Sequence, residues 1–414
     1  MITIAARQPA RGFRAAQRHP LDLTYGIEEE FFLVDPASRD LVTAPPSGFL
    51  RECRLKLAER VGEEMLRAQV ELTTPILHSS AQALESLAGL RQELGQVAQR
   101  HGLALVASGT HPLANWEAHQ HTDKPRYDRL VDDYQIVGRR NLVNGLHVHV
   151  GIPDGVDRVA LMNRLVPWLP VFLSLSTSSP FWNGRRTGLY SYRQAAYDEH
   201  PRSGIPDAFE DEAAYAAFVE LLARCGAIGD GSFLWWNIRP STRYPTLELR
   251  IADACTRLDD ALALAAAFRC LVRAHLRQEG LGVRRTSMSR RVADENRWRA
   301  KRYGTAASFI DEEAQAAVGF TEVLERMLAL IGPDAQALEC EREVAHLRTI
   351  LRDGTSAHQQ LAIYHAERDR FMPRQRALQA VVDWLHETTL AMPQASGAPT
   401  PGEGSQELVG AVNA

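Results

Sequence analysis

Cysteine is scarce in this sequence, and no two cysteines have the spacing of a metal or redox motif. The five that occur in 414 residues are Cys53, Cys225, Cys255, Cys270 and Cys340. A zinc site built from thiolates would need closer pairs, such as C-x-x-C. We therefore interpret the five as reduced thiols of a cytoplasmic protein.

Long apolar runs and an excess of charge of either sign are also missing. No run approaches the roughly 18 residues that span a bilayer, and the first residues lack the apolar core of a signal peptide. With 51 acidic and 47 basic residues the net charge is −4, so no overall cationic field would attract nucleic acid or anionic lipid. We expect neither a nucleic-acid partner nor a membrane.

Two glycine-rich motifs that bind phosphates are absent. The sequence contains no G-x-x-x-x-G-K-[ST] loop and no G-x-G-x-x-G turn. If ATP is a substrate, it is therefore bound by something other than a P-loop or a Rossmann turn.

The patterns that are present predict an α+β fold in which several strands form one sheet. Strands are expected at about 23–34, 66–73, 103–108, 144–152, 233–238 and 245–252. Helices are expected at about 79–102, 157–178, 211–225 and 259–279, and in almost everything after residue 310.

The two ends of the sequence differ in composition from the rest. Residues 1–21 are rich in arginine and contain no acid, and we expect a flexible arm there, with a transit peptide as the alternative. Residues 393–414 are rich in proline, glycine and serine and should be disordered. This leaves residues 22–392 as one expected domain.

The run TYGIEEEFFLV places three consecutive acids in an otherwise apolar strand. Because side chains alternate along a strand, Glu28 and Glu30 share one face and Glu29 lies on the other. Residues two apart are separated by about 6.7 Å, so Glu28 and Glu30 could reach two neighbouring metal ions. The alternative is an ordinary solvated strand face.

Three later strands have a similar polar face. QVELTTPI presents Glu71, NGLHVHVGI presents His147 and His149, and PTLELRIAD presents Glu248 beside Arg250. Each has a simpler alternative: a half-exposed strand, structural histidines, or a surface ion pair. If the four faces converge, the buried carboxylates require divalent cations, and carboxylates with imidazole but no thiolate favour Mg²⁺ or Mn²⁺. Glu248 would then bind metal and Arg250 phosphate.

Other basic residues are candidates for binding ATP or substrate. Arg139 lies in YQIVGRRNLVNG, Arg193 in GLYSYRQA and Arg239 in FLWWNIRPS. Arg297 and Arg302 lie on a probable helix in NRWRAKRYG. The alternative for the helical pair and for Arg139 is a solvated surface.

Several segments together resemble a known family, the carboxylate-amine ligase branch of the glutamate-cysteine ligase type 2 family. In chain order they are GIEEEFFLV, VELTTPI, ASGTHPL, NGLHVHVGI, LSLSTSSPFWNGRRTGLYSYR, WWNIRPS, TLELRIAD and NRWRAKRYG. The resemblance covers about residues 23–305. Each segment alone is modest, but eight in order are highly specific.

The resemblance implies a glutamine-synthetase-like fold: a curved, mainly antiparallel sheet of about six strands with a polar active-site face, helices on the other face and a helical C-terminal third. It implies that the metal ligands are Glu28, Glu30, Glu71, His147 and Glu248. Arg250 would contact the transferring phosphoryl group, and His149 would face nucleotide or substrate. A homodimer is also expected by family likeness.

The implied reaction is ATP-dependent amide formation. ATP would phosphorylate a carboxylate to an acyl phosphate, and an amine would displace the phosphate to leave an amide, ADP and phosphate. The family name implies glutamate and cysteine, and thus γ-glutamylcysteine, although the substrates of this branch can differ. Two alternatives stay open: a dinuclear metal-dependent amidase or peptidase, and a non-catalytic nucleotide-binding homologue.

Overall fold

The computed structural model describes residues 21–278, 280–282 and 287–392. Its largest sheet has seven strands in the order β10-β11-β5-β1-β3-β2, with β4 also paired to β1. These strands are β1 (Tyr25–Val34), β2 (Val61–Glu63), β3 (Gln69–Thr73), β4 (Ala104–Val106), β5 (Leu146–Gly151), β10 (Ile238–Pro240) and β11 (Thr246–Leu249). All of its pairings are antiparallel, which confirms the expected α+β class.

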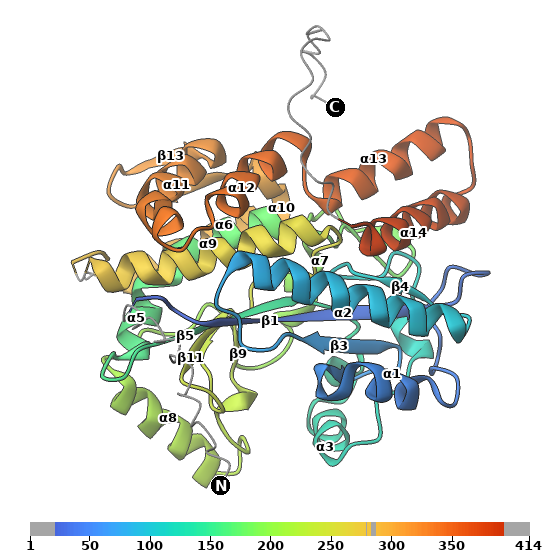
Figure 1. The fold of residues 1–414 in the computed structure, drawn as a ribbon, viewed down its shortest axis with the longest axis horizontal. Helices are drawn as coiled ribbons and strands as arrows, with labels where there is room; N and C mark the ends of the chain where they lie inside the picture. The colour runs from blue at the N-terminus through green and yellow to red at the C-terminus, as the bar shows by residue number, and fades with distance from the viewer. Residues whose placement is uncertain (1–20, 279, 283–286, 393–414) are drawn as a thin grey trace, which may run out of the picture.

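One face of the sheet is covered by long helices (Figure 1). The first layer is α2 (Ser80–Arg100) and α9 (Leu258–Arg277), and α2 begins where the Ser79 side chain caps the backbone N–H of Gln82. Beyond them lie α11 (Phe320–Ala337), α12 (Glu341–Asp353) and α13 (Ser356–Asp369), whereas α14 (Arg374–Leu390) packs directly against β4. The C-terminal third is thus helical as expected, apart from the hairpin β12 (Ser308–Asp311) and β13 (Ala316–Gly319).

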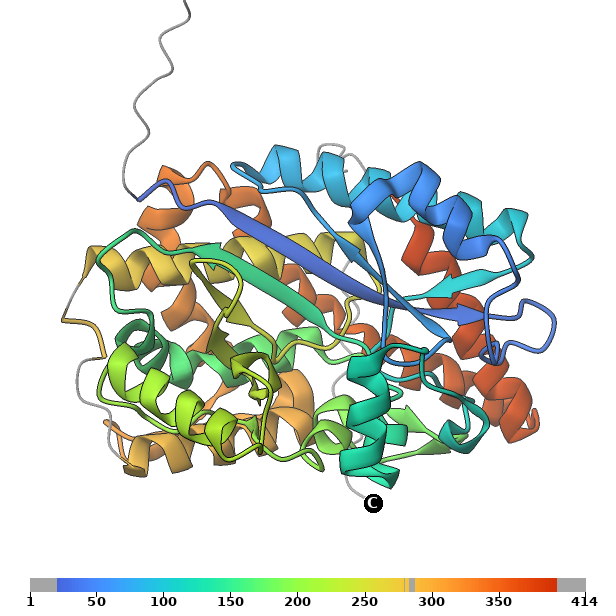
Figure 2. The same ribbon diagram turned by 90° about the horizontal axis from the view of Figure 1, so that it is seen from below.

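The opposite face of the sheet is less covered. Seen from below, strands β1 and β5 of the sheet run diagonally across the picture (Figure 2). The helices α3 (Pro125–Tyr134) and α8 (Glu212–Arg224) lie in front of the sheet in this view. The remaining helices are α1 (Phe49–Leu57), α4 (Ile136–Arg139), α5 (Arg158–Leu165), α6 (Leu169–Ser176), α7 (Tyr192–Tyr197) and α10 (Ser287–Tyr303).

Alternation along β1 decides which side chains meet each layer. Ile27 and Phe31 are fully buried in apolar clusters, and Glu29 is buried on their side, where Arg91 of α2 pairs with it. Glu28 and Glu30 therefore face the less covered side, as the alternation predicts. The fold thus separates an apolar face, which holds the Glu29–Arg91 ion pair, from a polar face.

Two of the expected elements are divided in the structure. The helix expected over 157–178 is interrupted by a 3₁₀ turn at Val166–Trp168, because Pro167 cannot continue the α-helical hydrogen bonds. The strand expected over 233–238 is divided: β9 (Trp235–Trp236) pairs with β8 (Ser203–Gly204) in a separate two-stranded sheet, while β10 joins the main one.

Within the described part of the chain, one helical stretch is long and apolar enough to cross a membrane. It is Arg158–Ser176, and 72% of its most apolar window is buried inside the protein. It therefore has the character of a core helix. The predictions of a flexible arm before residue 22 and of a disordered tail after residue 392 fall, apart from Leu21, outside the described residues.

Candidate active site

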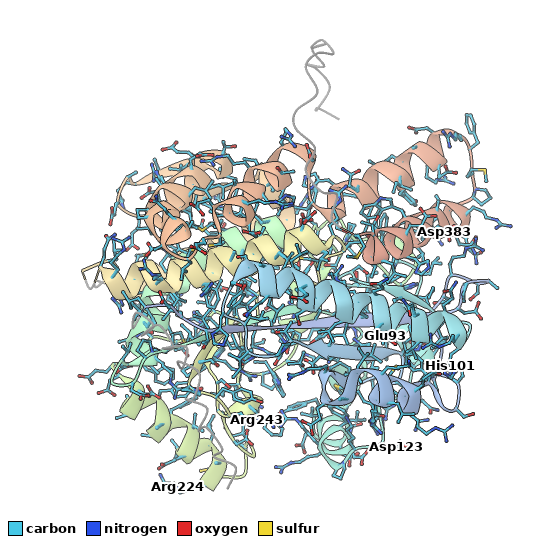
Figure 3. The ribbon with its side chains drawn as sticks, in the orientation of Figure 1. Glu93, His101, Asp123, Arg224, Arg243 and Asp383 are labelled. Carbon is cyan, nitrogen blue, oxygen red and sulfur yellow. The ribbon has the colours of Figure 1, made fainter. Side chains whose placement is uncertain are left out.

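The polar face of the main sheet lines a cavity of about 810 Å³. Its walls include Tyr127 of α3 on one side and the β10–β11 loop with Arg243 on the other. Figure 3 shows Arg243 below the sheet, between α8 and α3. The carboxylates that line the cavity are Glu28, Glu30, Glu59, Glu64, Glu71 and Glu248.

Strand register brings the predicted acids and histidines into contact distance. Glu30 of β1 lies directly opposite Glu71 of β3, and Glu28 lies opposite His147 of β5. His149 lies opposite Glu248 of β11. Directly opposed residues have Cβ atoms about 4.5–5.5 Å apart, so these side chains form one continuous polar patch across four strands.

Glu28 is the centre of this patch because both histidines reach it. Its Oε2 lies 3.3 Å from His147 Nδ1 and its Oε1 lies 3.3 Å from His149 Nε2. The other nitrogen of His149 contacts Thr246 Oγ1 at 2.9 Å, whereas His147 Nε2 is buried and has no hydrogen-bond partner among the described residues. His147 therefore has one ring nitrogen available to a ligand.

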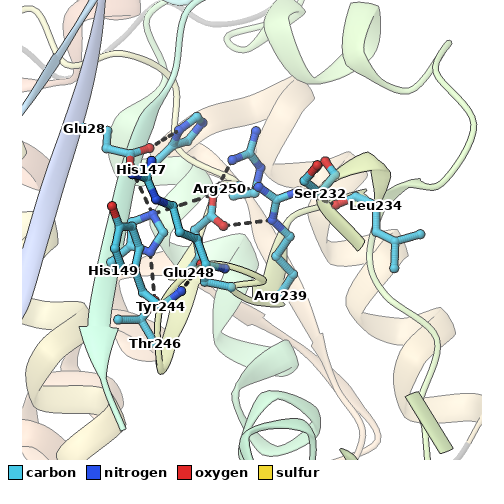
Figure 4. A network of polar contacts seen from close by, with 12 residues as sticks. Glu28, His147, His149, Ser232, Leu234, Arg239, Tyr244, Thr246, Glu248 and Arg250 are labelled. Carbon is cyan, nitrogen blue, oxygen red and sulfur yellow. Dashed lines mark hydrogen bonds and ion pairs between the residues drawn. The ribbon is translucent and has the colours of Figure 1, made fainter. Parts of the chain in front are cut away.

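Glu248 is held between two arginines (Figure 4). Arg239 Nε lies 2.8 Å from Glu248 Oε2, and Arg250 Nη1 contacts Glu248 Oε1. Arg239 also donates to the carbonyls of Ser232 and Leu234, each at 2.9 Å. Its guanidinium is thus anchored by protein groups, while the buried Nε of Arg250 has no hydrogen-bond partner within the part of the chain that the structure describes.

Glu64 belongs to the same patch, although the sequence analysis missed it. One of its carboxylate oxygens lies within 4.8 Å of those of Glu30 and Glu71. It follows the short strand β2, which pairs with β3 so that Gly62 faces Glu71. In the sequence, the acidic pair Glu63–Glu64 precedes Glu71 by a few residues. Only the pairing of β2 with β3 shows that Glu64 lies near Glu71 in the fold.

The carboxylates differ in how their charge is balanced. Burial alone would raise the pKa of Glu28 and Glu248, but the histidines lower the pKa of Glu28, and Arg250 and Arg239 hold the pKa of Glu248 well below its usual range. Burial and the Glu64 carboxylate raise the pKa of Glu30 to about 8. Burial and neighbouring carboxylates raise the pKa of Glu71 well above its usual value. In the described chain Glu30 and Glu71 form no ion pair with an arginine or lysine, so the more distant Arg193 and Arg250 only partly offset the raised pKa values.

These donors suit a hard divalent cation. Three overlapping groups each place three ligand atoms within 4.8 Å of one another: Glu28 with Glu71 and His147, Glu28 with His149 and Glu248, and Glu30 with Glu64 and Glu71. Burial and the nearby Arg250 lower the pKa of His147 to about 4, which keeps its imidazole neutral, as metal binding requires. Oxygen donors with imidazole and no thiolate favour Mg²⁺ or Mn²⁺.

Arg193 is a buried cation at the edge of the cavity. It is 2% exposed and its Nη1 donates to the carbonyl of Arg250 at 3.3 Å, whereas its Nε has no hydrogen-bond partner in residues 21–278, 280–282 and 287–392. The guanidinium packs against Gly145, where an added Cβ would lie 2.8 Å from Arg193 Cζ. The backbone N–H of Gly145 donates to Glu30 Oε2 at 2.6 Å. Because Gly145 has no side chain, the Arg193 guanidinium and the Glu30 carboxylate can both lie against its backbone.

The backbone of Arg193 is positioned by a buried carboxylate. Asp253 accepts hydrogen bonds from Ser179 Oγ at 2.7 Å, Ser191 Oγ at 2.8 Å and the Ser178 N–H at 3.0 Å. Ser179 Oγ in turn accepts from the Arg193 N–H at 3.0 Å. This network ties the segment that carries Arg193 to the end of β11.

The other basic candidates lie elsewhere. Arg139 lines a separate hollow with Trp116, and Arg302 is exposed on α10 with its guanidinium over the Tyr303 ring. Neither is among the residues that line the cavity in the described chain. Arg297 is not on a solvated face: it is buried and pairs with Asp198, because α10 packs against the segment that follows α7.

The sequence matches a known family over most of its length. The profile of a family described as Glutamate-cysteine ligase family 2 matches residues 24–379. A protein of Ectopseudomonas mendocina with the provisional name glutamate–cysteine ligase 2 is 47% identical over 366 residues, which cover 88% of this chain and 97% of that protein. One of the same provisional name from Rhodospirillum rubrum is 46% identical over 383 residues, covering 91% and 98%.

Two solved structures share the fold at low sequence identity. The glutamate–cysteine ligase of Francisella tularensis, solved with AMP, has a TM-score of 0.65 and 12% identity and covers 90% of each chain. A bifunctional glutathione synthetase from Pasteurella multocida has a TM-score of 0.64 and 14% identity, with 89% of this chain and 53% of that chain covered. At such identities the likeness concerns the fold alone.

Proposed function

The chain belongs to glutamate–cysteine ligase family 2 and is an ATP-dependent carbon–nitrogen ligase, and from this premise we propose that it forms an amide through an acyl phosphate. ATP would phosphorylate the substrate carboxylate, and the amine would then displace phosphate. The products would be the amide, ADP and phosphate. A carboxylate needs this activation because its oxygen is too poor a leaving group for an amine to displace at neutral pH.

The observation that carries the proposal is the meeting of carboxylates, imidazoles and guanidinium groups on one sheet face inside a single cavity. We propose that the cation ligands are Glu28, Glu30, Glu64, Glu71, His147 and Glu248. Bound Mg²⁺ or Mn²⁺ would neutralise the phosphates of ATP and the charge of the transferring phosphoryl group. The raised pKa of Glu30 and of Glu71 supports this assignment, because these carboxylates need an added cation to ionise at neutral pH.

Arg250 is assigned to the transferring phosphoryl group. Its Nη1 is held by Glu248 and its Nη2 lies 3.4 Å from the Tyr197 hydroxyl, so the guanidinium is oriented before substrate arrives. A preoriented cation stabilises developing charge without reorganising during the reaction. His149 lies beside it, 3.9 Å from Glu248, where it can contact nucleotide or substrate.

The substrates follow from the names of the relatives, which point to glutamate and cysteine and thus to γ-glutamylcysteine. Arg193 supports an acidic substrate, because its buried guanidinium offers Nε as an unpaired donor to a carboxylate. Arg239 is already committed to Glu248 and two carbonyls, so it orients Glu248 in this proposal.

The test is to supply ATP and Mg²⁺ with a panel of amino acids and with hydroxylamine as a general amine. Hydroxamate and ADP should appear together and in equal amounts. Formation of AMP and pyrophosphate would contradict the acyl-phosphate route. Amide hydrolysis without ATP would instead indicate the metal-dependent amidase, for which the two arginines on Glu248 have no evident use.

A further inference from the structure

Two of the five cysteines meet outside the active-site cavity, since neither is among the residues that line it. Cys270 lies within α9, and Cys340 occupies the position just before α12. Their sulfur atoms are 3.3 Å apart, and the two residues are 0% and 1% exposed. The spacing of 70 residues concealed this contact in the sequence.

We propose that Cys270 and Cys340 are a modification site that forms an intrachain disulfide when hydroperoxides oxidise the protein. Both backbone positions are already defined: Cys270 is inside a helix, and the N–H of Cys340 donates to the Ala335 carbonyl at 2.9 Å. A disulfide needs sulfur atoms about 2.05 Å apart, so the two must approach by only about 1.2 Å.

The reaction balances with the peroxide as the sole oxidant. One thiol is oxidised by hydrogen peroxide to a sulfenic acid, with release of one water molecule. The neighbouring sulfur then attacks the sulfenic sulfur, the S–S bond forms, and a second water leaves with the proton of the attacking thiol. Two thiols and one peroxide thus give one disulfide and two waters.

The reaction should be slow and selective. The hydrogen bond with Cys340 and burial hold the pKa of Cys270 well above its usual value, and the thiolate is the reactive form. Cys53 is buried in a different apolar cluster, and Cys255 contacts the Asp253 carbonyl. Neither has another cysteine as a hydrogen-bond partner in the described chain, so the pairing of Cys270 with Cys340 is the one the fold favours.

The bond would restrain the helical layer behind the sheet. It would join α9 to the start of α12, which pack against each other. Next to Cys270, Arg269 donates to the Leu23 carbonyl just before β1, at 2.7 Å. A crosslink that closes a loop of 70 residues reduces the conformational entropy of the unfolded chain. For a protein of this size the expected rise in Tm is therefore roughly 3 to 6 °C.

The test uses the full chain with Cys225→Ser, which removes the exposed thiol. The protein is held for hours with hydrogen peroxide, denatured, labelled with N-ethylmaleimide and measured by mass spectrometry. We expect label on Cys53 and Cys255 only, a loss of about 2 Da from the crosslinked pair, a linked peptide containing Cys270 and Cys340, and reversal by dithiothreitol.

Two further variants serve as controls. Cys340→Ala should take up label at Cys270 and lose the rise in Tm, whereas Cys53→Ala should keep both the crosslink and the rise. Label on all four cysteines after oxidation, or two added oxygens on Cys270 or Cys340 without a link, would overturn the proposal. A crosslink that leaves Tm unchanged would overturn the claim that it restrains the helical layer.

Discussion

Glu29 and Arg91 form a buried, two-point ion pair on the face of the sheet that turns away from the cavity. Arg91 Nη2 lies 2.6 Å from Glu29 Oε1, and Arg91 Nε lies 2.9 Å from Glu29 Oε2. Arg91 also donates to the carbonyls of Cys255, Thr256 and Thr389. The middle acid of the triplet therefore joins β1 to α2, to the chain before α9 and to the end of α14.

Replacing Glu29 should harm stability, whereas replacing Glu30 should harm catalysis. Glu29→Gln leaves the Arg91 charge buried without its partner, and we expect the free energy of unfolding to fall by about 3 kcal/mol or more. The folded fraction should keep most of its activity, since Glu29 does not face the cavity. Glu30→Gln should abolish hydroxamate formation while the urea midpoint stays near that of the wild type. A stable but inactive Glu29→Gln would contradict this division of roles.

Metal binding should depend on Glu64 and not on its neighbour Glu63. Removing Glu64 leaves Glu30 and Glu71 with fewer oxygen donors, so Glu64→Gln should weaken Mn²⁺ binding at least about tenfold. Glu63→Gln is the matched control, because Glu63 pairs with Arg54 at the surface. Calorimetric titration of both variants measures the difference. EDTA should stop ADP formation in the wild type, and equal Mn²⁺ affinity in the two variants would exclude Glu64 as a ligand.

Gly145→Ala should reduce turnover without unfolding the protein. The new methyl group would displace the Arg193 guanidinium, which packs against Gly145, and would disturb the contact with Glu30. Misplacement of a binding group by about 1 Å can cost about 100-fold in rate, and we expect a loss of that order in kcat/KM. Gly89→Ala, on an exposed part of α2 with nothing within 4 Å of the new methyl group, should stay fully active. Full activity of Gly145→Ala would remove Arg193 from the proposed site.

His111 should make the protein lose stability as the pH falls. Burial lowers its pKa to about 3, and its neutral Nδ1 accepts from the N–H groups of Leu113 and Ala114. The unfolded chain therefore binds a proton below about pH 6.5 that the folded chain does not bind until about pH 3. Between these two pH values, protonation of His111 in the unfolded chain should lower the free energy of unfolding by about 1.4 kcal/mol for each unit by which the pH falls.

His111→Asn keeps a hydrogen-bond acceptor but cannot take up a proton in this range. Urea unfolding from pH 7 to pH 4 should therefore show a shallower loss of stability in the variant than in the wild type. Equal slopes would mean that His111 is protonated in the folded protein.

Alternation along strands was enough to predict which faces are polar. A period of two residues separates Glu28 and Glu30 from Glu29, and His147 and His149 from Val148, whatever the rest of the chain does. In the same way, alternation places Leu247 and Leu249 on the face opposite Glu248, and both are fully buried. Within a strand, the local sequence decides which face each side chain lies on, because successive side chains point to opposite sides of the backbone.

Tertiary structure decided which of these residues meet. The pairing of β2 with β3 adds Glu64, packing of α10 buries Arg297, and the course of the chain leaves Arg139 and Arg302 outside the cavity. The contact of Cys270 with Cys340 likewise depends on how α9 and α12 pack. The sequence by itself determined the chemistry that each strand carries, because alternation is local. The partners of each side chain came only from strand register and helix packing, because those rest on contacts between residues far apart in the chain.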